Sequence, residues 1–464
     1  MPESVAIVGA GLVGCVAALG LSAKGYDVSV YEMRKDPRTD AASGKNMRSI
    51  NLAVSDRGIR ALHYIDSAMA NRVLRNVIPM TGRMIHDATG IRQELQPYGL
   101  FGESIKSIDR LLLNRALLDE LDRRDIAVHF GHKIVDMSSV SVDAPVALDF
   151  LTAGERRTYT YDYVVGADGA YSQSRYLMQK TMRMDYFQKY VAQQYLELYI
   201  PPADSMDAAG GVPRYSLDPN HLHIWPRKEY MLIALANHDG SFTVTFFCTW
   251  ALIEALHTAD AFLTFFRLSF PDAYTLIGEE ALRQAHRHQP RGALMQLAVS
   301  PFASPNRRSV LIGDAAHSMV PFYGQGMNCG FEDVHVLMKL LDDSDDLKEA
   351  LARYTPARKD DVDTICRLAY ENYRNMSAQV LDPLYLLRKK IDYVFGKYAN
   401  GRLFPWIPMY TMISFRGDIR YSDAERIEKR QAGILAFLLW AGAGGIAVLA
   451  AGFSAHWFRT LSRH

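Results

Sequence analysis

The stretch between residues 5 and 32 decides the fold. It reads VAIVGAG (5–11), LVGCVAALGLSAKG (12–25) and YDVSVYE (26–32), which is the order strand, glycine turn, helix and strand. The turn contains Gly9-Ala10-Gly11-Leu12-Val13-Gly14, a GxGxxG placed between a strand and a helix. The first glycine allows the tight bend, the second lets the backbone approach a pyrophosphate, and the third lets helix and strand pack closely. The free N–H groups at the helix N-terminus also suit phosphates.

Glu32 ends the second strand, eighteen residues after Gly14. A carboxylate in this place accepts hydrogen bonds from a ribose and repels a 2′-phosphate. The pattern therefore predicts that FAD or NAD, rather than NADP, binds at the turn.

Composition limits the classes of protein that remain. The chain has 464 residues, of which 49% are hydrophobic and 22% charged, so we expect two or three globular domains. A net charge of +1 gives no reason to expect nucleic acid as a partner. A strand pattern begins at Ser4, which leaves no room for an N-terminal signal. The four cysteines are Cys15, Cys248, Cys329 and Cys366, and none forms a CxxC pair. This spacing argues against structural zinc and against a disulfide framework. We therefore expect a reducing compartment.

The middle of the chain changes character. Residues 221–226, 230–236 and 241–248 are strand-like, and Asp239-Gly240 is a hairpin signal, so we expect an antiparallel sheet there. Helical spacing is found in residues 52–76, 110–124, 259–287 and 346–400. The sequence thus predicts an α/β protein whose parts are a Rossmann-like FAD-binding domain (1–180 and 301–345), an antiparallel-sheet substrate domain (181–300) and a C-terminal helical region (346–430).

Residues 433–453, GILAFLLWAGAGGIAVLAAGF, form a run of 21 residues without a charge. Such a run is long enough to span a hydrocarbon core, although a buried packing helix is the alternative. Arginine and lysine flank it on both sides, at Arg426, Lys429, Arg430, Arg459 and Arg463. We expect residues 431–464 to be a transmembrane tail anchor, with the catalytic part in the cytosol.

Three further motifs favour a flavin. Residues 164–169 (VVGADG) and 311–317 (LIGDAAH) resemble the DG and GD motifs of flavin hydroxylases, in which the second aspartate binds the ribityl chain. Each aspartate, Asp168 or Asp314, is alone also typical of a helix N-cap. Residues 321–328 (PFYGQGMN) bring glycines that allow close approach to a planar ring, and open a helix whose positive end stabilises a reduced flavin. Together the motifs predict resident FAD.

Other stretches are similar to the kynurenine 3-monooxygenase family. They are RSINLAVSDRG (48–58), PMTGRMIHD (79–87), QPYG (96–99), LHIWPR (222–227), MLIALAN (231–237), SFTVTFF (241–247), ENYRNMS (371–377) and IPMYTMISF (407–415). The resemblance runs from about residue 4 to 421. It implies that L-kynurenine, NADPH and O₂ give 3-hydroxykynurenine through a flavin C4a-hydroperoxide, within the kynurenine pathway of tryptophan degradation. NADPH would be a transient co-substrate, and the anchored relatives imply the mitochondrial outer membrane.

The resemblance also assigns roles to residues. Substrate carboxylate contacts are implied for Arg83 and Tyr98, and other amino-acid contacts for Asn372 and Tyr410. An apolar wall around the aryl ring is implied for Leu222, Ile233, Leu235, Phe247 and Phe322. FAD contacts, with the motif residues included, are Gly9, Gly11, Val13, Gly14, Tyr31, Glu32, Met33, Arg34, Ala53, Arg110, Ile134, Asp168, Asp314, Gly324, Met327 and Asn328. No catalytic group beyond the flavin and no metal ligand is expected.

Two other functions stay open. One is a flavin hydroxylase for a different aromatic substrate, which shares the FAD motifs but does not explain Arg83, Tyr98, Asn372 and Tyr410 together. The other is a binding protein that kept this fold and lost its flavin. The intact GxGxxG and Asp314 argue against the second.

Overall fold

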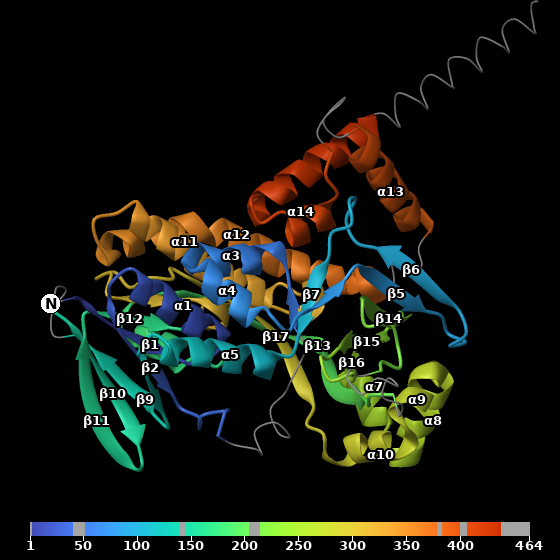
Figure 1. Ribbon diagram of the computed structural model, residues 1–464, viewed down its shortest axis with the longest axis horizontal. Coiled ribbons are helices and arrows are strands. Elements are labelled where there is room, and N and C mark those ends of the chain that lie inside the picture. The colour runs from blue at the N-terminus through green and yellow to red at the C-terminus, as the bar shows by residue number, and fades with distance from the viewer. Residues whose placement is uncertain are drawn as a thin grey trace, which may run out of the picture.

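The computed structural model describes residues 2–39, 52–139, 144–203, 214–377, 383–399 and 406–437. Two large sheets organise these residues, and helices cover both (Figure 1). The α/β class that the sequence predicts is confirmed.

A five-stranded parallel sheet contains the glycine turn. Its order is β18-β12-β1-β2-β8, formed by Ser309–Leu311, Tyr163–Gly166, Ser4–Val8, Asp27–Glu32 and Ala127–Phe130. Both faces are covered, so the central strand β1 is almost entirely buried and apolar, as parallel strands are. Around it lie α1 (Leu12–Ala23), α5 (Arg110–Asp122) and α11 (Gly326–Asp342) (Figure 1). The predicted strand–turn–helix–strand unit is therefore confirmed.

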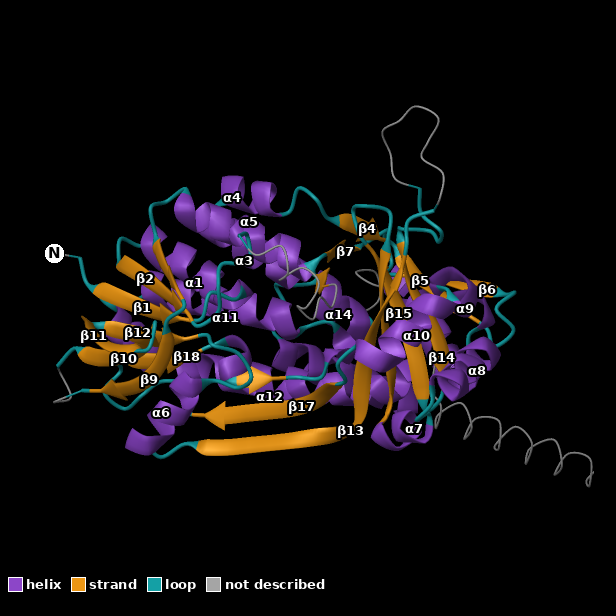
Figure 2. Cartoon of the chain, turned by 90° about the horizontal axis from the view of Figure 1, so that it is seen from below, coloured by secondary structure: helices purple, strands orange, loops and turns teal. Residues whose placement is uncertain are grey.

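The second sheet has eight strands in the order β19-β17-β13-β16-β15-β14-β5-β6. Their bounds are His317–Ser318, Gly292–Ser300, Asp185–Ile200, Phe242–Thr249, Tyr230–Ala236, His221–Arg227, Gly82–His86 and Gln93–Pro97. All pairs are antiparallel except β14 with β5. The long strands β13 and β17 run from this sheet toward the five-stranded sheet (Figure 2). The three predicted strands of the middle region are β14, β15 and β16.

One face of the eight-stranded sheet packs against four short helices. They are α7 (Trp250–Ala255), α8 (Ala259–Ser269), α9 (Pro271–Ile277) and α10 (Glu279–His288). Pro271 and Gly278 (φ 87°) interrupt the helix that the sequence predicts over 259–287, because proline cannot continue a helix from within and Gly278 leaves helical geometry. This face has its own hydrophobic cluster, separate from the main one. The opposite face belongs to the main cluster, together with the five-stranded sheet.

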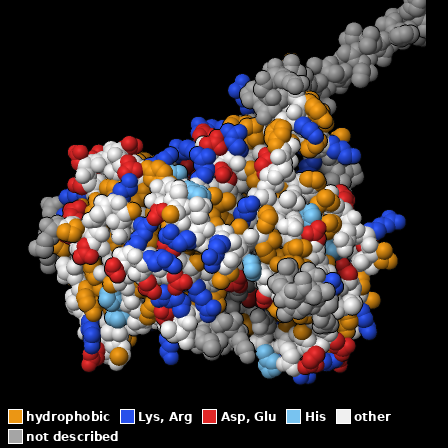
Figure 3. All heavy atoms as spheres, in the orientation of Figure 1, with side chains coloured by type: hydrophobic (Ala, Val, Ile, Leu, Met, Phe, Trp, Pro, Cys, Tyr) orange, Lys and Arg blue, Asp and Glu red, His pale blue; other side chains and the backbone are white. Residues whose placement is uncertain are grey.

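Smaller elements complete the frame. Two three-stranded sheets are formed by β3 (Leu52–Val54), β7 (Ile105–Ile108) and β4 (Ile78–Met80), and by β11 (Glu155–Tyr161), β10 (Val146–Thr152) and β9 (Lys133–Ser138). The other helices are α3 (Asp56–Ile65), α4 (Ser67–Val73), α6 (Gln173–Thr181), α12 (Leu347–Ser377), α13 (Pro383–Val394) and α14 (Met409–Phe415). Short single turns are η1 (Gly313–Ala315), η2 (Pro321–Tyr323) and η4 (Phe395–Ala399). On the face shown in Figure 3, basic and acidic side chains lie interspersed among polar and hydrophobic ones. Elsewhere, the buried Glu120 pairs with Arg72 at 2.7 Å.

The prediction of a C-terminal transmembrane helix is corrected. Among the helices of the described residues, none is both long and apolar enough to cross a bilayer. The helix that enters the predicted span, residues 421–437, is strongly charged in its first turns, and Glu425 and Glu428 pair with Arg367 (2.5 Å) and Arg388 (3.0 Å) of the helical region. The rest of that span, from residue 438, lies outside the described residues.

Candidate active site

The glycine turn after β1 has the shape that a pyrophosphate needs. A Cβ on Gly9 (φ 106°) would lie 2.6 Å from the Ala167 carbonyl oxygen, and one on Gly14 only 1.9 Å from the Gly9 oxygen. These two glycines are therefore required by the protein itself. A Cβ on Gly11 would meet no protein atom within 4 Å. Gly11 thus faces open space, where a bound phosphate fits against the N-terminus of α1.

Glu32 lies against this turn at the end of β2. Its Oε2 accepts a hydrogen bond from the Ala10 amide (3.1 Å) and its Oε1 accepts one from the Arg34 amide (2.9 Å). The neighbouring Met33 is 58% exposed, and Arg34 is exposed as well. A carboxylate with remaining acceptor capacity at an accessible strand end suits ribose hydroxyls.

Two predicted FAD residues lie in the core. Tyr31 is buried, stacks on Phe150 with ring centroids 4.1 Å apart, and shares a 2.6 Å hydrogen bond between its hydroxyl and that of Tyr161. Ile134 on β9 is buried in the same cluster. Their side chains are therefore used in packing, and only their backbone remains for a ligand.

The two aspartates of the DG and GD motifs behave differently. Asp168 accepts hydrogen bonds from the Ser172 hydroxyl (2.5 Å) and the Ser174 amide (2.9 Å). The N-cap of α6 is Ser172, so Asp168 stabilises the start of this helix without being its cap. Asp314 lies deep in the molecule, yet its side chain is solvent-accessible between buried neighbours. Burial raises the pKa of the Asp314 carboxyl, and the charge of Arg110 opposes this shift. Arg110 therefore lies close enough to Asp314 for their charges to interact, and an accessible carboxylate beside a cation suits a ribityl chain and a phosphate.

The turn between η2 and α11 is fastened by Asn328. Its side-chain nitrogen donates to the carbonyl oxygens of Ala53 and Gly324, both at 2.8 Å, and its oxygen accepts from the Ser55 amide at 2.9 Å. Gly324 has φ 66°, in the left-handed region that favours glycine. Met327, the second residue of α11, is half-buried. The structure thus brings β3 and this turn together, as the prediction for Ala53, Gly324 and Asn328 requires.

Val13 packs the first motif against the second. A Cβ on Gly313 would lie 3.1 Å from a methyl of Val13, and one on Gly330 only 2.5 Å. The GxGxxG helix, the GD motif and α11 therefore converge at one point. An open Gly11, an accessible Asp314 and these close approaches fit FAD.

A cationic and aromatic cluster lies on the other side. Arg83, on β5, is only 7% exposed, and its guanidinium carbon lies 4.6 Å from the ring centroid of Tyr410 and 5.7 Å from that of Tyr98. The rings of Tyr98 and Tyr410 stack at 5.5 Å, and Tyr410 stacks on Tyr323 at 5.8 Å. Burial and the nearby Tyr410 raise the pKa of Tyr98 far above its usual value, so the phenol stays protonated. Its buried hydroxyl faces the Arg83 guanidinium and the Tyr410 hydroxyl, and the charge of Arg83 opposes the rise in pKa.

Asn372 and the apolar residues complete this side. The Asn372 side-chain nitrogen donates to the Phe322 carbonyl oxygen at 2.8 Å. The ring of Phe322 meets that of Phe247 at 5.1 Å in an edge-to-face contact. Leu222 pairs with Arg83 across β14 and β5, and the predicted wall residues Leu222, Ile233, Leu235, Phe247 and Phe322 all belong to or pack on the main cluster. Four of the predicted wall residues therefore lie on one sheet next to Arg83, and Phe322 of η2 packs against them.

One residue here escaped sequence reasoning. Lys389, on α13, has its pKa lowered to about 8 by burial and by the charge of Arg83, while Glu94 acts in the opposite direction. The lysine therefore lies near the arginine and adds positive charge. Nothing in the local pattern around Lys389 indicates this, because the neighbourhood comes from folding α13 over β5 and β6 (Figure 1).

A buried ion cluster supports the GD motif from behind. Asp333 accepts from the Gly313 amide (2.8 Å) and from Arg358 Nε (2.7 Å), and pairs with His317 Nε2 at 2.6 Å. His317, Cys329 and Asp333 lie close enough to suggest a metal site. Both oxygens of Asp333 are already engaged by protein donors, so we interpret the trio as part of an ion cluster.

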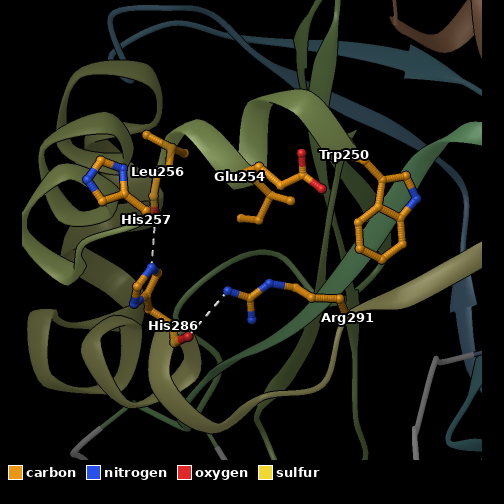
Figure 4. Close-up of a pocket in the computed structure, with 7 residues that line it drawn as sticks. Trp250, Glu254, Leu256, His257, His286 and Arg291 are labelled. Atoms are coloured by element: carbon orange, nitrogen blue, oxygen red, sulfur yellow. Dashed lines mark hydrogen bonds between the residues drawn. The ribbon is translucent and has the colours of Figure 1, made fainter.

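A separate hollow of about 290 Å³ lies between α7 and the end of α10. Figure 4 shows Arg291 and Trp250 on one side and His257 and His286 on the other. Arg291 donates to the carbonyl oxygens of Gln289 (2.9 Å) and His286 (3.3 Å), which caps the end of α10. None of the predicted site residues lines this hollow.

Known proteins share this architecture. A family model described as FAD binding domain matches residues 3–367. Solved structures with the same fold include 2-methyl-3-hydroxypyridine-5-carboxylic acid oxygenase (TM-score 0.63, 15% identity, covering 92% of this chain and 98% of that chain). Klebsiella pneumoniae HpxO complexed with FAD and uric acid is another (TM-score 0.60, 19% identity, covering 84% of this chain and 92% of that chain).

Sequence relatives are much more similar. A protein named kynurenine 3-monooxygenase from Debaryomyces hansenii is 57% identical over 93% of this chain and 92% of its own length. The proteins of that name from Candida albicans (56% identity, 93% of this chain and 92% of its own) and Saccharomyces cerevisiae (46%, 94% and 95%) match similarly. FAD is therefore the cofactor, and the chain belongs to the kynurenine 3-monooxygenase family.

Proposed function

We propose that this protein is an FAD-dependent monooxygenase that converts L-kynurenine, NADPH and O₂ into 3-hydroxykynurenine, NADP⁺ and water. One observation carries the proposal: the buried Arg83 lies beside the stacked rings of Tyr98 and Tyr410 and next to an apolar sheet face. This arrangement suits a ligand with a carboxylate at one end and an aryl ring at the other. The names of the 46–57% identical relatives agree with it.

In this proposal Arg83 holds the substrate carboxylate. A guanidinium offers two parallel N–H donors that match a carboxylate, and burial keeps water from competing. The buried Tyr98 hydroxyl, which stays protonated beside Arg83, adds a further donor. Asn372 uses its nitrogen on the Phe322 carbonyl oxygen, which leaves its own oxygen to accept from the substrate ammonium.

The apolar residues orient the ring and exclude water. Leu222, Ile233, Leu235 and Phe247 present one apolar sheet face, and Phe322 closes it from the turn between η2 and α11, which we call the flavin turn. Bound FAD supplies the redox chemistry, carrying electrons from NADPH to O₂ so that one oxygen atom reaches the ring. Glycine turn, Glu32 and Asp314 hold that cofactor, and the N-terminus of α11 supplies a positive dipole beside it.

A direct assay tests the function. NADPH oxidation is followed with purified FAD-loaded protein, with and without L-kynurenine, and the product is identified by mass and by its hydroxyl position. Kynurenine-dependent oxidation with one oxygen added at the 3-position supports the proposal. Oxidation that kynurenine stimulates without a hydroxylated product would show that it is only an effector and would refute the proposal. The location at the mitochondrial outer membrane, with the catalytic part facing the cytosol, stays a prediction that fractionation with protease protection tests.

A further inference from the structure

Arg57 is a buried arginine that joins three segments of the chain. It is the second residue of α3 and is 1% exposed. Its Nη1 donates to Glu332 Oε1 on α11 at 2.6 Å. On its other side, Nε donates to the Ile413 carbonyl oxygen (3.2 Å) and Nη2 to the carbonyl oxygens of Met412 (3.4 Å) and Ile419. One side chain therefore links α3, α11 and the segment that contains α14.

These contacts cap α14. Met412 and Ile413 lie in the last turn of that helix, where carbonyl groups have no partner within the helix. A guanidinium that binds them satisfies buried acceptors and complements the negative end of the helix. The pairing with Glu332 helps to keep Arg57 charged, since both it and Tyr421 raise the pKa of the arginine against the effect of burial. The position of α14 thus depends on Arg57.

Tyr421 continues the connection to the flavin turn. Its ring centroid lies 3.8 Å from the Arg57 guanidinium carbon, in a cation–π contact. Its hydroxyl donates to the side-chain oxygen of Gln325 at 2.9 Å, and both residues are buried. Gln325 immediately precedes α11, and its carbonyl oxygen accepts from the Cys329 amide at 2.7 Å. Tyr421 therefore bonds to the residue that begins the helix beside the flavin.

The same α14 carries Tyr410, whose ring stacks on Tyr98 and lies under Arg83. We call Arg83, Tyr98 and Tyr410 the substrate clamp. We infer that Arg57 and Tyr421 are positioning residues for hydroxylation, because they fix α14, and with it the clamp, relative to the turn at Gln325. This inference rests on the proposed function for the identity of the clamp. It assigns a role to two residues that touch neither the predicted carboxylate site nor the predicted ring wall.

The geometry matters because oxygen transfer needs the ring carbon at contact distance. A displacement of about 1 Å at a reacting atom can cost on the order of a hundredfold in rate. With the ring in place, NADPH + H⁺ + O₂ + ArH gives NADP⁺ + H₂O + ArOH. With the ring displaced, the same two electrons leave as peroxide: NADPH + H⁺ + O₂ gives NADP⁺ + H₂O₂. The ratio of peroxide to hydroxylated product therefore reports the position of the ring.

The sharpest variant is Tyr421→Phe, which removes one hydroxyl and leaves the ring on Arg57. The matched control is Tyr215→Phe, because the Tyr215 hydroxyl also makes a 2.9 Å hydrogen bond, to the Asn237 carbonyl oxygen, and packs on the other hydrophobic cluster. Loss of one hydrogen bond in the link should raise the peroxide-to-product ratio about fivefold in Tyr421→Phe. The ratio in Tyr215→Phe should stay at the wild-type value.

A second readout needs no substrate. The visible absorption spectrum of bound FAD should change in Tyr421→Phe, because Tyr421 bonds to Gln325 beside the flavin turn. The spectrum should stay the same in Tyr215→Phe, because Tyr215 bonds to Asn237 instead. Arg57→Lys should change both readouts in the same direction as Tyr421→Phe, because an ammonium retains the charge without reaching Glu332 and two carbonyls together. If Arg57→Lys fails to fold, Tyr421→Phe alone decides.

An unchanged peroxide ratio and FAD spectrum in Tyr421→Phe would overturn the inference, and so would an equal rise in Tyr215→Phe. Failure of the proposed function has a different signature, namely no hydroxylated product from the wild-type protein. In that case the FAD spectrum of the two tyrosine variants still tests the link to the flavin turn.

Discussion

Replacing Arg83 with methionine removes the cation of the predicted substrate site while keeping a side chain of similar length. Arg83 is 7% exposed, so bulk water screens its charge poorly. A hydrogen bond to a charged group contributes about 1.5–3 kcal/mol. Kynurenine affinity in Arg83→Met should therefore fall by about ten- to a hundredfold, because each 1.4 kcal/mol is about a factor of ten. Lys389 lies near enough to feel Arg83, so the loss should lie toward the lower end.

The fold should tolerate this change. The guanidinium also lies 4.6 Å from the ring of Tyr410, a contact that contributes about 0.5–2 kcal/mol. Domains are stable by about 5–15 kcal/mol, so the variant should fold. FAD should stay bound, because the glycine turn and Asp314 belong to other elements.

The assay is a titration of kynurenine followed through the absorbance of bound FAD, which measures affinity without turnover. The control is Arg92→Met, an exposed arginine in the segment between β5 and β6 of the same sheet, whose substitution should leave affinity unchanged. Wild-type affinity in Arg83→Met would refute the assignment of the carboxylate site. Loss of FAD in Arg83→Met would refute the separation between cofactor and substrate contacts.

Three further predictions follow from individual sites. Gly11→Ala should weaken FAD binding without lowering the thermal stability of the FAD-free protein, because its Cβ meets no protein atom. Gly14→Ala should lower that stability, because its Cβ would lie 1.9 Å from a carbonyl oxygen. Equal melting temperatures of the two FAD-free variants would contradict this prediction. Burial lowers the pKa of Lys389 to about 8, so this lysine should lose its charge above pH 8. The KM for kynurenine should therefore rise above pH 8 in the wild type and not in Lys389→Met. Measuring KM across a pH series tests this. Asp333→Asn replaces the carboxylate that pairs with the buried Arg358 by a neutral amide. The free energy of unfolding, measured with urea, should fall by about 3–5 kcal/mol. A fall below about 1 kcal/mol would show that the ion cluster does not stabilise the fold.

The sequence predicted best what short-range geometry determines. The GxGxxG turn needs glycine at Gly9 and Gly14 because neighbouring backbone leaves no room for a Cβ, and such a requirement is visible in a few consecutive letters. The antiparallel strands β14, β15 and β16 are equally local, since a hairpin signal joins two of them. These features were confirmed.

Features that depend on distant pairing were less accessible. Asp168 and Asp314 occupy similar motifs, but only the fold shows that Asp168 is used to start α6 while Asp314 stays accessible. Likewise, the parallel pairing of β5 with β14 brings Arg83 beside Leu222 from a remote segment, and no local pattern encodes it. The prediction of a C-terminal transmembrane helix was wrong, and here too contacts with distant residues were not visible in the local pattern. Hydropathy described an apolar run correctly, but the described helix leading into it is charged and bound to the helical region.

The predicted substrate site is assembled from four separate elements, which explains why connecting residues matter. Arg83 comes from β5, Tyr98 follows β6, Asn372 belongs to α12 and Tyr410 to α14. Each of these elements is anchored elsewhere, and α14 has only seven residues, too few to be stable alone. Its position must therefore come from tertiary contacts. Arg57 provides two of them through the carbonyl oxygens of Met412 and Ile413, and it also binds the Ile419 carbonyl oxygen just after the helix. Because α14 carries Tyr410, a loss of these contacts should displace Tyr410 relative to Arg83. Substitutions at Arg57 should therefore affect the coupling of NADPH oxidation to hydroxylation more strongly than they affect the retention of FAD.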